Sequence, residues 1–120
     1  MAAFDVKTDP GSGILCCRIY RFLSDEEVQK LAAALLATVT AARRRHGTIR
    51  LLFDNRLGAV FSAKAAEMLV VLRDGRNDRD KTAVLVSDSI NKLQTKRTAG
   101  PCTKVFMSEA DAMAWLAVAD

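Results

Sequence analysis

The stretch LLFDNRLGAVFSAKAAEML, residues 51–69, decides how this chain is interpreted. An apolar strand ends near Phe53 and runs into the polar triplet Asp54-Asn55-Arg56. After a short loop, Ser62 is placed to cap a helix. A buried strand that leads into a helix is typical of α/β sheets. The junction between the two is therefore the first place to look for a functional site.

Apolar segments on both sides of this stretch predict the other strands of the sheet. We expect strands over residues 4–8, 14–20, 49–53, 82–86 and 104–107. Turn residues fill positions 9–13, so the first two strands are predicted to form a hairpin. The segment 82–86 is apolar on both faces, which indicates a buried parallel strand.

Four helices are predicted between and after these strands. The first begins at the N-cap Ser24, with Glu27 completing a capping box, and ends at Gly47. Its apolar face carries Val28, Leu31, Leu35, Val39 and Ala42. The second starts at Ser62, and the third runs from Ser87 to about residue 98. The fourth covers 109–118, and we expect Ala110, Met113, Ala114 and Ala117 to share its apolar face.

The composition fits one soluble domain. The chain has 120 residues, half of them hydrophobic and 27% charged, which is enough for one core but not for two ordinary domains. The fold class expected is α/β, a single domain over 1–120 with a mixed sheet of about five strands. No apolar run approaches the roughly 20 residues of a membrane span, and no signal-peptide pattern opens the chain. A cytoplasmic location is therefore expected.

Metal, cofactor and catalytic patterns are absent from the sequence. Cys16 and Cys17 are neighbours that point to opposite faces of a strand, Cys102 is far away, and His46 is the single histidine. We expect reduced, structural thiols, no metal and no cofactor. No set of residues forms a recognisable nucleophile, base or carboxylate pair, so an enzyme is not expected.

The order of elements resembles the STAS fold, which is shared by anti-sigma-factor antagonists and the cytoplasmic domains of sulphate transporters. The resemblance covers nearly the whole chain. It rests on the strand at 14–20 before a long helix, the strand end at 51–54, the strand at 83–86, and the short strand that leads into Ser108-Glu109-Ala110. The chain is most similar to divergent bacterial members, which some classifications group with lipid-binding Sec14-type domains.

The chain departs from the antagonists of that family at one place. They carry an Asp-Ser-Ser/Thr-Gly-like box, with a phosphorylated serine or threonine, at the start of the second helix. Here the corresponding residues are Phe61-Ser62-Ala63-Lys64-Ala65. Ser62 would stand at the aspartate position and Ala63 or Lys64 at the phosphoacceptor position. The resemblance therefore implies a regulatory module without the usual phosphoswitch. Ser62 is still a hydroxyl at a helix N-terminus, and a residual phosphoswitch there stays open as a third hypothesis beside the two functions below.

The candidate site follows from the geometry of parallel sheets. Ligands bind beyond the carboxyl ends of the strands, where helix N-termini also point. The candidate binding or docking edge consists of Asp54, Asn55, Arg56, Ser62, Lys64 and Asp88. In one interpretation, Arg56 and Ser62 hold a small anion or a partner's carboxylate. In the other, Ser62 and Asp88 only cap helices while Asp54 pairs with Arg56.

Two functions remain open at this stage. The first is a non-enzymatic interaction module that docks a protein partner, or a second copy through an exposed edge strand. The second is a small-ligand or lipid-binding domain, with a pocket between helices carrying Leu36, Met68, Leu72 and Met113. The net charge of +4 is too modest, and aromatic residues too few, for nucleic acid to be the expected partner.

Overall fold

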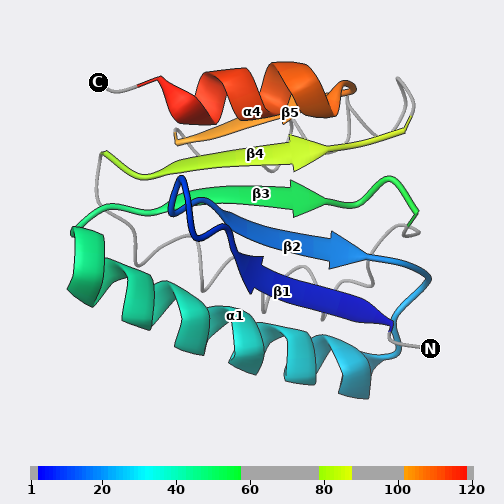
Figure 1. The fold of residues 1–120 in the computed structure, drawn as a ribbon. Coiled ribbons are helices and arrows are strands. Elements are labelled where there is room, and N and C mark those ends of the chain that lie inside the picture. Colours follow the sequence, from blue (N-terminus) through cyan, green and yellow to red (C-terminus); the bar gives the residue numbers. More distant parts are fainter. Residues whose placement is uncertain (1–2, 58–78, 88–101, 119–120) are drawn as a thin grey trace.

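A computed structural model describes residues 3–57, 79–87 and 102–118 of the chain. Its elements follow in the order β1 (Phe4–Thr8), β2 (Leu15–Ile19), α1 (Asp25–His46), β3 (Arg50–Asp54), β4 (Lys81–Leu85), β5 (Thr103–Phe106) and α4 (Glu109–Ala117). The strands form one sheet in the order β1-β2-β3-β4-β5 (Figure 1). β1 is antiparallel to β2, and the other neighbours are parallel.

This arrangement confirms the predicted α/β class, the mixed five-stranded sheet and the N-terminal hairpin. β4 lies between two parallel neighbours and is almost entirely buried, as its two-sided apolar pattern indicated. Two of the four predicted helices are α1 and α4. The other two, predicted from Ser62 and from Ser87, lie in 58–78 and 88–101, outside the described residues.

The long helix α1 begins and ends as its sequence predicts. The Ser24 hydroxyl accepts a hydrogen bond from the backbone N–H of Glu27 at 3.2 Å, and the Glu27 carboxylate accepts one from the Ser24 N–H at 3.1 Å. This reciprocal capping box satisfies two donors that the first turn leaves open. At the other end, Gly47 has φ 78°, a conformation that glycine adopts without a steric penalty, and its N–H bonds to the Arg43 carbonyl.

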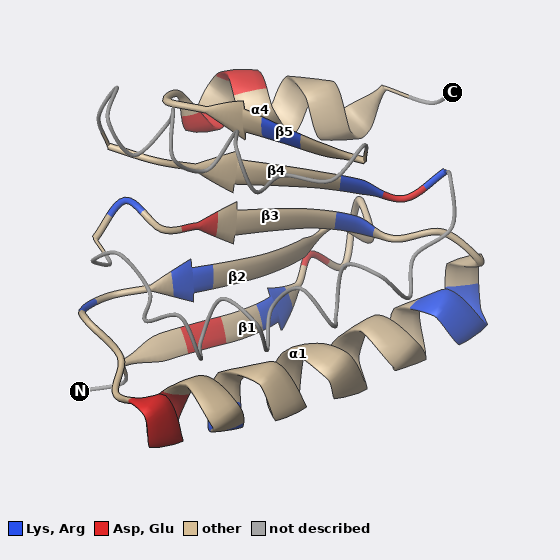
Figure 2. Cartoon of the chain, turned by 180° about the vertical axis from the view of Figure 1, so that it is seen from behind, with Lys and Arg blue, Asp and Glu red and all other residues tan. Residues whose placement is uncertain are grey.

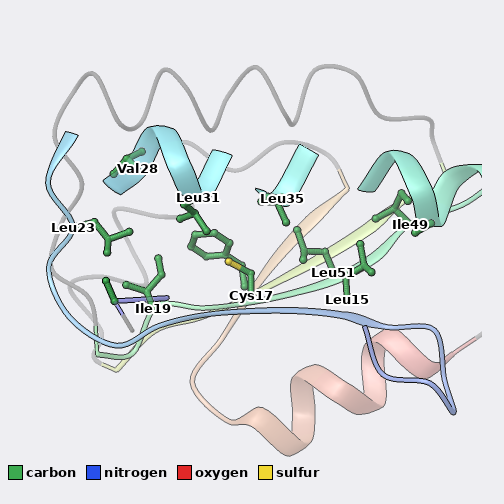
Figure 3. Packing of buried hydrophobic residues seen from close by; sticks show 12 residues of the cluster. Leu15, Cys17, Ile19, Leu23, Val28, Leu31, Leu35, Ile49 and Leu51 are labelled. Carbon is green, nitrogen blue, oxygen red and sulfur yellow. The ribbon is translucent and has the colours of Figure 1, made fainter. Parts of the chain in front are cut away.

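The two described helices cover opposite faces of the sheet. Alternate residues of β3 separate the two cores: Leu51 and Phe53 pack with α1, whereas Leu52 packs with α4. The adjacent thiols divide in the same way, with Cys17 in the α1 core and Cys16 against the α4 core. Figure 3 shows the α1 core, in which Cys17 lies beneath Leu31 and Leu35. The domain therefore has three layers, helix, sheet and helix.

The packing face of α4 was predicted wrongly. Ala110, Ala114 and Ala117 are exposed, and Met113 is only partly buried. The fully buried residues are Ala112 and Leu116, which pack on Leu52, Ala83 and Leu85. Alanine fits on either side of a helix, so a stripe of alanines does not determine the face. The leucine does, because burying it removes more apolar surface from water.

A buried ion pair ties the end of α1 to the start of β3 and β4. The Asp80 side chain is wholly buried, and its carboxylate accepts a hydrogen bond from the Arg43 guanidinium at 2.6 Å. The same carboxylate accepts the backbone N–H of Ile49 at 2.9 Å. A buried carboxylate needs such partners to offset its loss of hydration. Asp80, just before β4, thus holds the last turn of α1 and the residue before β3 in place.

Candidate docking edge

The parallel strands bring their carboxyl ends to one side of the sheet. We call this side the carboxyl edge and define it by residues 18–22, 54–57 and 106–109, which end or follow β2, β3 and β5. The first turns of α1 and α4 lie at the same side (Figure 1). The predicted site residues Asp54, Asn55 and Arg56 belong to this edge.

Asp54 is the centre of the carboxyl edge. It is the last residue of β3 and lies in register with Arg18 of β2, so both side chains project from the α4 face of the sheet. The Arg18 guanidinium donates to the Asp54 carboxylate at 2.6 Å. The Asp54 side chain is only 10% exposed, whereas that of Arg18 is 33% exposed. Asp54 is therefore the buried member of this ion pair, and Arg18 is the more exposed member.

Arg56 closes around the same carboxylate. Its Nε and Nη2 donate to the two Asp54 oxygens at 3.0 and 2.8 Å, and its backbone N–H donates at 3.2 Å. Glu109, from the first turn of α4, then accepts from Arg18 at 2.7 Å and from Arg56 at 3.2 Å. We call these four residues, Arg18, Asp54, Arg56 and Glu109, the charge network. Two positive and two negative side chains leave it with no net charge.

The charge network holds Asp54 in its ionised form. Burial by itself raises the pKa of this carboxyl group, but the hydrogen bonds from Arg56, followed by those from Arg18, outweigh it. The pKa of Asp54 is therefore below its usual range, and a negative charge persists there at neutral pH. A group held ionised by two arginines is not poised to exchange protons near neutrality.

The predicted pairing of Asp54 with Arg56 is confirmed, and the interpretation of Arg56 as a free anion ligand is weakened by its two carboxylate partners. Asn55 donates its backbone N–H to Leu85 at 3.0 Å. Its side-chain oxygen is buried without a hydrogen-bond partner in the described part of the chain. The other predicted site residues, Ser62, Lys64 and Asp88, lie outside the described residues, and their role stays a prediction.

Sequence reasoning missed Arg18 and Glu109. Arg18 interrupts an apolar strand, which marks it as unusual, but its partner depends on the register between β2 and β3. Glu109 occupies a helix first turn, where an acidic residue is expected for helix stability alone. Only the packing of α4 beside β3 brings it to Asp54. The sequence pattern does not show which residues far apart in the chain will pair, so the roles of Arg18 and Glu109 could not be predicted from it.

Exposed apolar side chains occur at the same end of the sheet as the charge network. They follow the ends of three strands: Tyr20, Phe22, Leu57 and Met107. Phe22 is 58% exposed and Leu57 67% exposed. Single exposed apolar residues are ordinary, and four at one end of a sheet make that end a candidate for an interaction surface. These residues were not part of the predicted site.

The alternative ligand pocket does not form as predicted. Leu36 lies on α1 and is 55% exposed, whereas Met113 lies on α4 and packs against the core on the opposite face of the sheet. A five-stranded sheet separates the two side chains, so they cannot line one cavity. Met68 and Leu72 lie outside the described residues.

The three cysteines are free thiols, and Cys17 is inert by its surroundings. Burial, with Asp5 nearby, raises the pKa of the Cys17 thiol to about 12. Within residues 3–57, 79–87 and 102–118, no cluster of three or more His, Cys, Asp or Glu side chains is placed to hold a metal ion. In the same segments, neither helix combines the length and apolar character needed to cross a membrane.

A three-layered domain with this strand order and a polar carboxyl edge belongs to the class of STAS-like α/β proteins. The SpoIIAA-like family model matches residues 14–117, and the chain is a member of that family. No curated protein matches the chain. Among solved structures, the chain is similar to an uncharacterised protein of the DUF3478 family from Shewanella loihica PV-4, which has a SpoIIAA-like fold. The two share 18% identity with a TM-score of 0.68, over 95% of this chain and 92% of the other.

Proposed function

We propose that this protein is a non-enzymatic, cytoplasmic regulatory module that docks a protein partner at its carboxyl edge. The contact surface consists of the charge network and the exposed apolar residues at the same end of the sheet. On this proposal the candidate residues Asn55, Ser62, Lys64 and Asp88 extend the same surface. On this proposal Ala63 or Lys64 stands at the family's phosphoacceptor position, and docking does not depend on phosphorylation there.

One observation carries this proposal: four exposed apolar side chains follow the same strand ends that hold a charge network with no net charge. Interfaces of this kind combine an apolar contact with hydrogen-bonded charged groups, and arginines and aromatic residues contribute most to binding. Phe22 and Leu57 supply the exposed apolar surface, and Arg56 supplies a guanidinium that is 38% exposed.

The charge network favours a protein over a small anion as the ligand. A free phosphate or carboxylate would have to displace Asp54 and Glu109 from Arg18 and Arg56. Both acids are already bound at 2.6–3.2 Å. A protein partner has no need to displace them, because it can cover the apolar residues and bond to the outer atoms of the network.

The proposal is tested with photo-crosslinking in the native host. A photoreactive phenylalanine analogue is placed at position 57 in one variant and at position 36 in the other. Leu57 lies at the carboxyl edge and Leu36 on the outer side of α1, and both leucines are more than half exposed. We expect a discrete cross-linked protein from position 57 that is absent from position 36.

A second variant links the cross-link to the charge network. Adding Arg56→Ala to the position-57 variant should weaken or abolish the product, since the guanidinium is part of the surface. Cross-linking to the same protein from both leucines, or to none from position 57, contradicts docking at the carboxyl edge.

A further inference from the structure

The opposite side of the sheet carries a second charged surface. We call it the amino edge; it contains the last turn of α1 and the first residues of β3 and β4. Arg79 precedes β4 at this edge, and its other cations are Arg43, Arg44, Arg45, Arg50 and Lys81. In Figure 2 the blue end of α1 lies on the same side as the blue starts of β3 and β4, while the red first turns of α1 and α4 lie on the other side.

Two of these cations are used inside the fold. Arg43 bonds to the buried Asp80 at 2.6 Å. Lys81 donates to the carbonyl of Val118 at 2.8 Å and lies over the Trp115 ring at 5.4 Å, so it closes the end of α4. Both side chains therefore have a structural role and are not available to a partner.

Three other cations, Arg44, Arg45 and Arg50, have no carboxylate partner within the described segments. Arg44 and Arg45 are exposed, and Arg50 is partly exposed. The negative end of the helix dipole accounts for cations in the last turn of α1. It does not account for Arg50, which begins a strand. Arg50 therefore needs another explanation, and it lies at the same edge as Arg44 and Arg45, which likewise lack a carboxylate partner in the described segments.

We propose that Arg44, Arg45 and Arg50 bind an acidic segment of a protein partner, at a surface separate from the carboxyl edge. Guanidinium groups match carboxylates with two parallel hydrogen bonds and lose less hydration than ammonium groups. The net charge of +4 and the unpaired arginines together attract an anionic chain.

The amino edge suits carboxylates better than nucleic acid. Binding of single strands uses exposed aromatic rings on which bases stack. The aromatic residue at this end is Trp115, which is partly buried and is faced by Lys81 and Lys104 at 5.4 and 6.0 Å. Its contact with the Phe106 ring occupies it further. No free ring therefore accompanies the three arginines in the described part of the chain.

The test measures fluorescence anisotropy with a labelled peptide of alternating glutamate and serine. An oligodeoxythymidylate of equal net charge serves as the competing probe. The variant R44Q/R45Q is compared with K30E, because each lowers the net charge from +4 to +2. Lys30 lies on the same helix with its side chain 70% exposed, but away from the amino edge. We expect peptide affinity to fall about tenfold in R44Q/R45Q and to change little in K30E.

Arg50→Gln alone should weaken peptide binding as well, while circular dichroism shows that the protein stays folded. Equal weakening in R44Q/R45Q and K30E would overturn the proposal, because overall charge would then explain binding. No peptide binding by the unmodified protein would overturn it too. If the oligonucleotide bound more tightly than the peptide, the ligand of the amino edge would be nucleic acid, and the acidic segment would be the wrong ligand.

Discussion

The two edges of the sheet use arginine in opposite ways. At the carboxyl edge, Arg18 and Arg56 share two carboxylates, and Arg21 binds Glu27 at 2.6 Å. At the amino edge Arg43 binds the buried Asp80, whereas neighbouring Arg44 has no carboxylate partner in the described segments. In Figure 2 the acidic first turns of α1 and α4 lie at one side together with basic residues, whereas the last turn of α1 at the other side is basic.

This difference separates charge that shapes the fold from charge that is open to a partner. A paired guanidinium fixes two elements relative to each other but attracts little from solution, because its field is cancelled nearby. An unpaired one contributes little to stability and keeps its long-range attraction. The carboxyl edge is therefore suited to a close-fitting, partly apolar contact, and the amino edge to an electrostatic one. The predictions below test this division.

The largest effect is expected from Asp80→Ala at the amino edge. The change removes the carboxylate that binds Arg43 and leaves the buried Ile49 N–H without this acceptor. Loss of a buried, charge-assisted pair should lower the free energy of unfolding by about 3 kcal/mol. Urea denaturation measures it. The matched control is Asp111→Ala, at an exposed position, which should change stability by no more than about 0.5 kcal/mol.

Equal losses in Asp80→Ala and Asp111→Ala would show that the amino edge has no structural ion pair. Its charges would then all belong to the surface, and the contrast between Arg43 and Arg44 would disappear.

The charge network at the carboxyl edge should give a smaller and pH-dependent effect. Asp54→Asn keeps the shape of the side chain but removes its charge, and should cost about 1–2 kcal/mol at pH 7. The pKa of Asp54 is lowered in the folded state, so its contribution is present above the unfolded pKa of about 3.9. That contribution is lost as the pH falls through the folded value.

The difference between wild type and Asp54→Asn should therefore shrink below about pH 4. Denaturation curves recorded at several pH values follow this change. Asp5→Asn is the control, because the ion-pair partner of Asp5 within the described residues is the exposed Lys7, at 3.2 Å. A difference for Asp54→Asn that is constant with pH would mean that its charge is not stabilising.

The sequence predicts the edges of this molecule less well than its layers. The apolar pattern of residues 82–86 predicts a strand by itself, and the spacing of Ser24 and Glu27 predicts a helix cap. These features depend on neighbours within a few residues, and each is confirmed. The pairing of Asp54 with Arg56 is local in the same sense, since two positions separate the residues.

What the sequence did not reveal depends on contacts far along the chain. Arg18 and Glu109 are separated by 91 positions and meet only because β2 and α4 lie on either side of Asp54. Arg43 and Asp80 are 37 positions apart. The face of α4 was wrong for a related reason: four alanines fit either environment, and the position of Leu116 on the sheet decided the outcome.

A further prediction concerns Arg21, an exposed arginine of the carboxyl edge. Its guanidinium is the main reason that the pKa of Glu27 is lowered to about 2 from the usual 4.5. Arg21→Gln should raise the pKa of Glu27, which a carbon-detected NMR titration of the carboxyl group measures directly. Lys30→Gln is the control: Lys30 pairs with Glu26, not Glu27. A pKa unchanged by Arg21→Gln would mean that this arginine is not neutralised in solution.

The last comparison between the edges uses two double variants of equal net charge, one of which should have the smallest effect on stability. R44Q/R45Q and R21Q/R56Q each lower the net charge from +4 to +2. R44Q/R45Q should change the free energy of unfolding by less than about 0.5 kcal/mol, since neither arginine has an ion-pair partner in the described segments. Because those charges are not cancelled nearby, this variant should nevertheless elute earlier from a cation-exchange column. R21Q/R56Q should lower stability in urea, because Glu27, Asp54 and Glu109 lose arginine partners. Its retention should fall less than that of R44Q/R45Q, because the charges it removes are already partly cancelled by these carboxylates. If the two variants lose retention equally, the arginines of both edges are equally open to solution, and the division between structural and available charge is wrong.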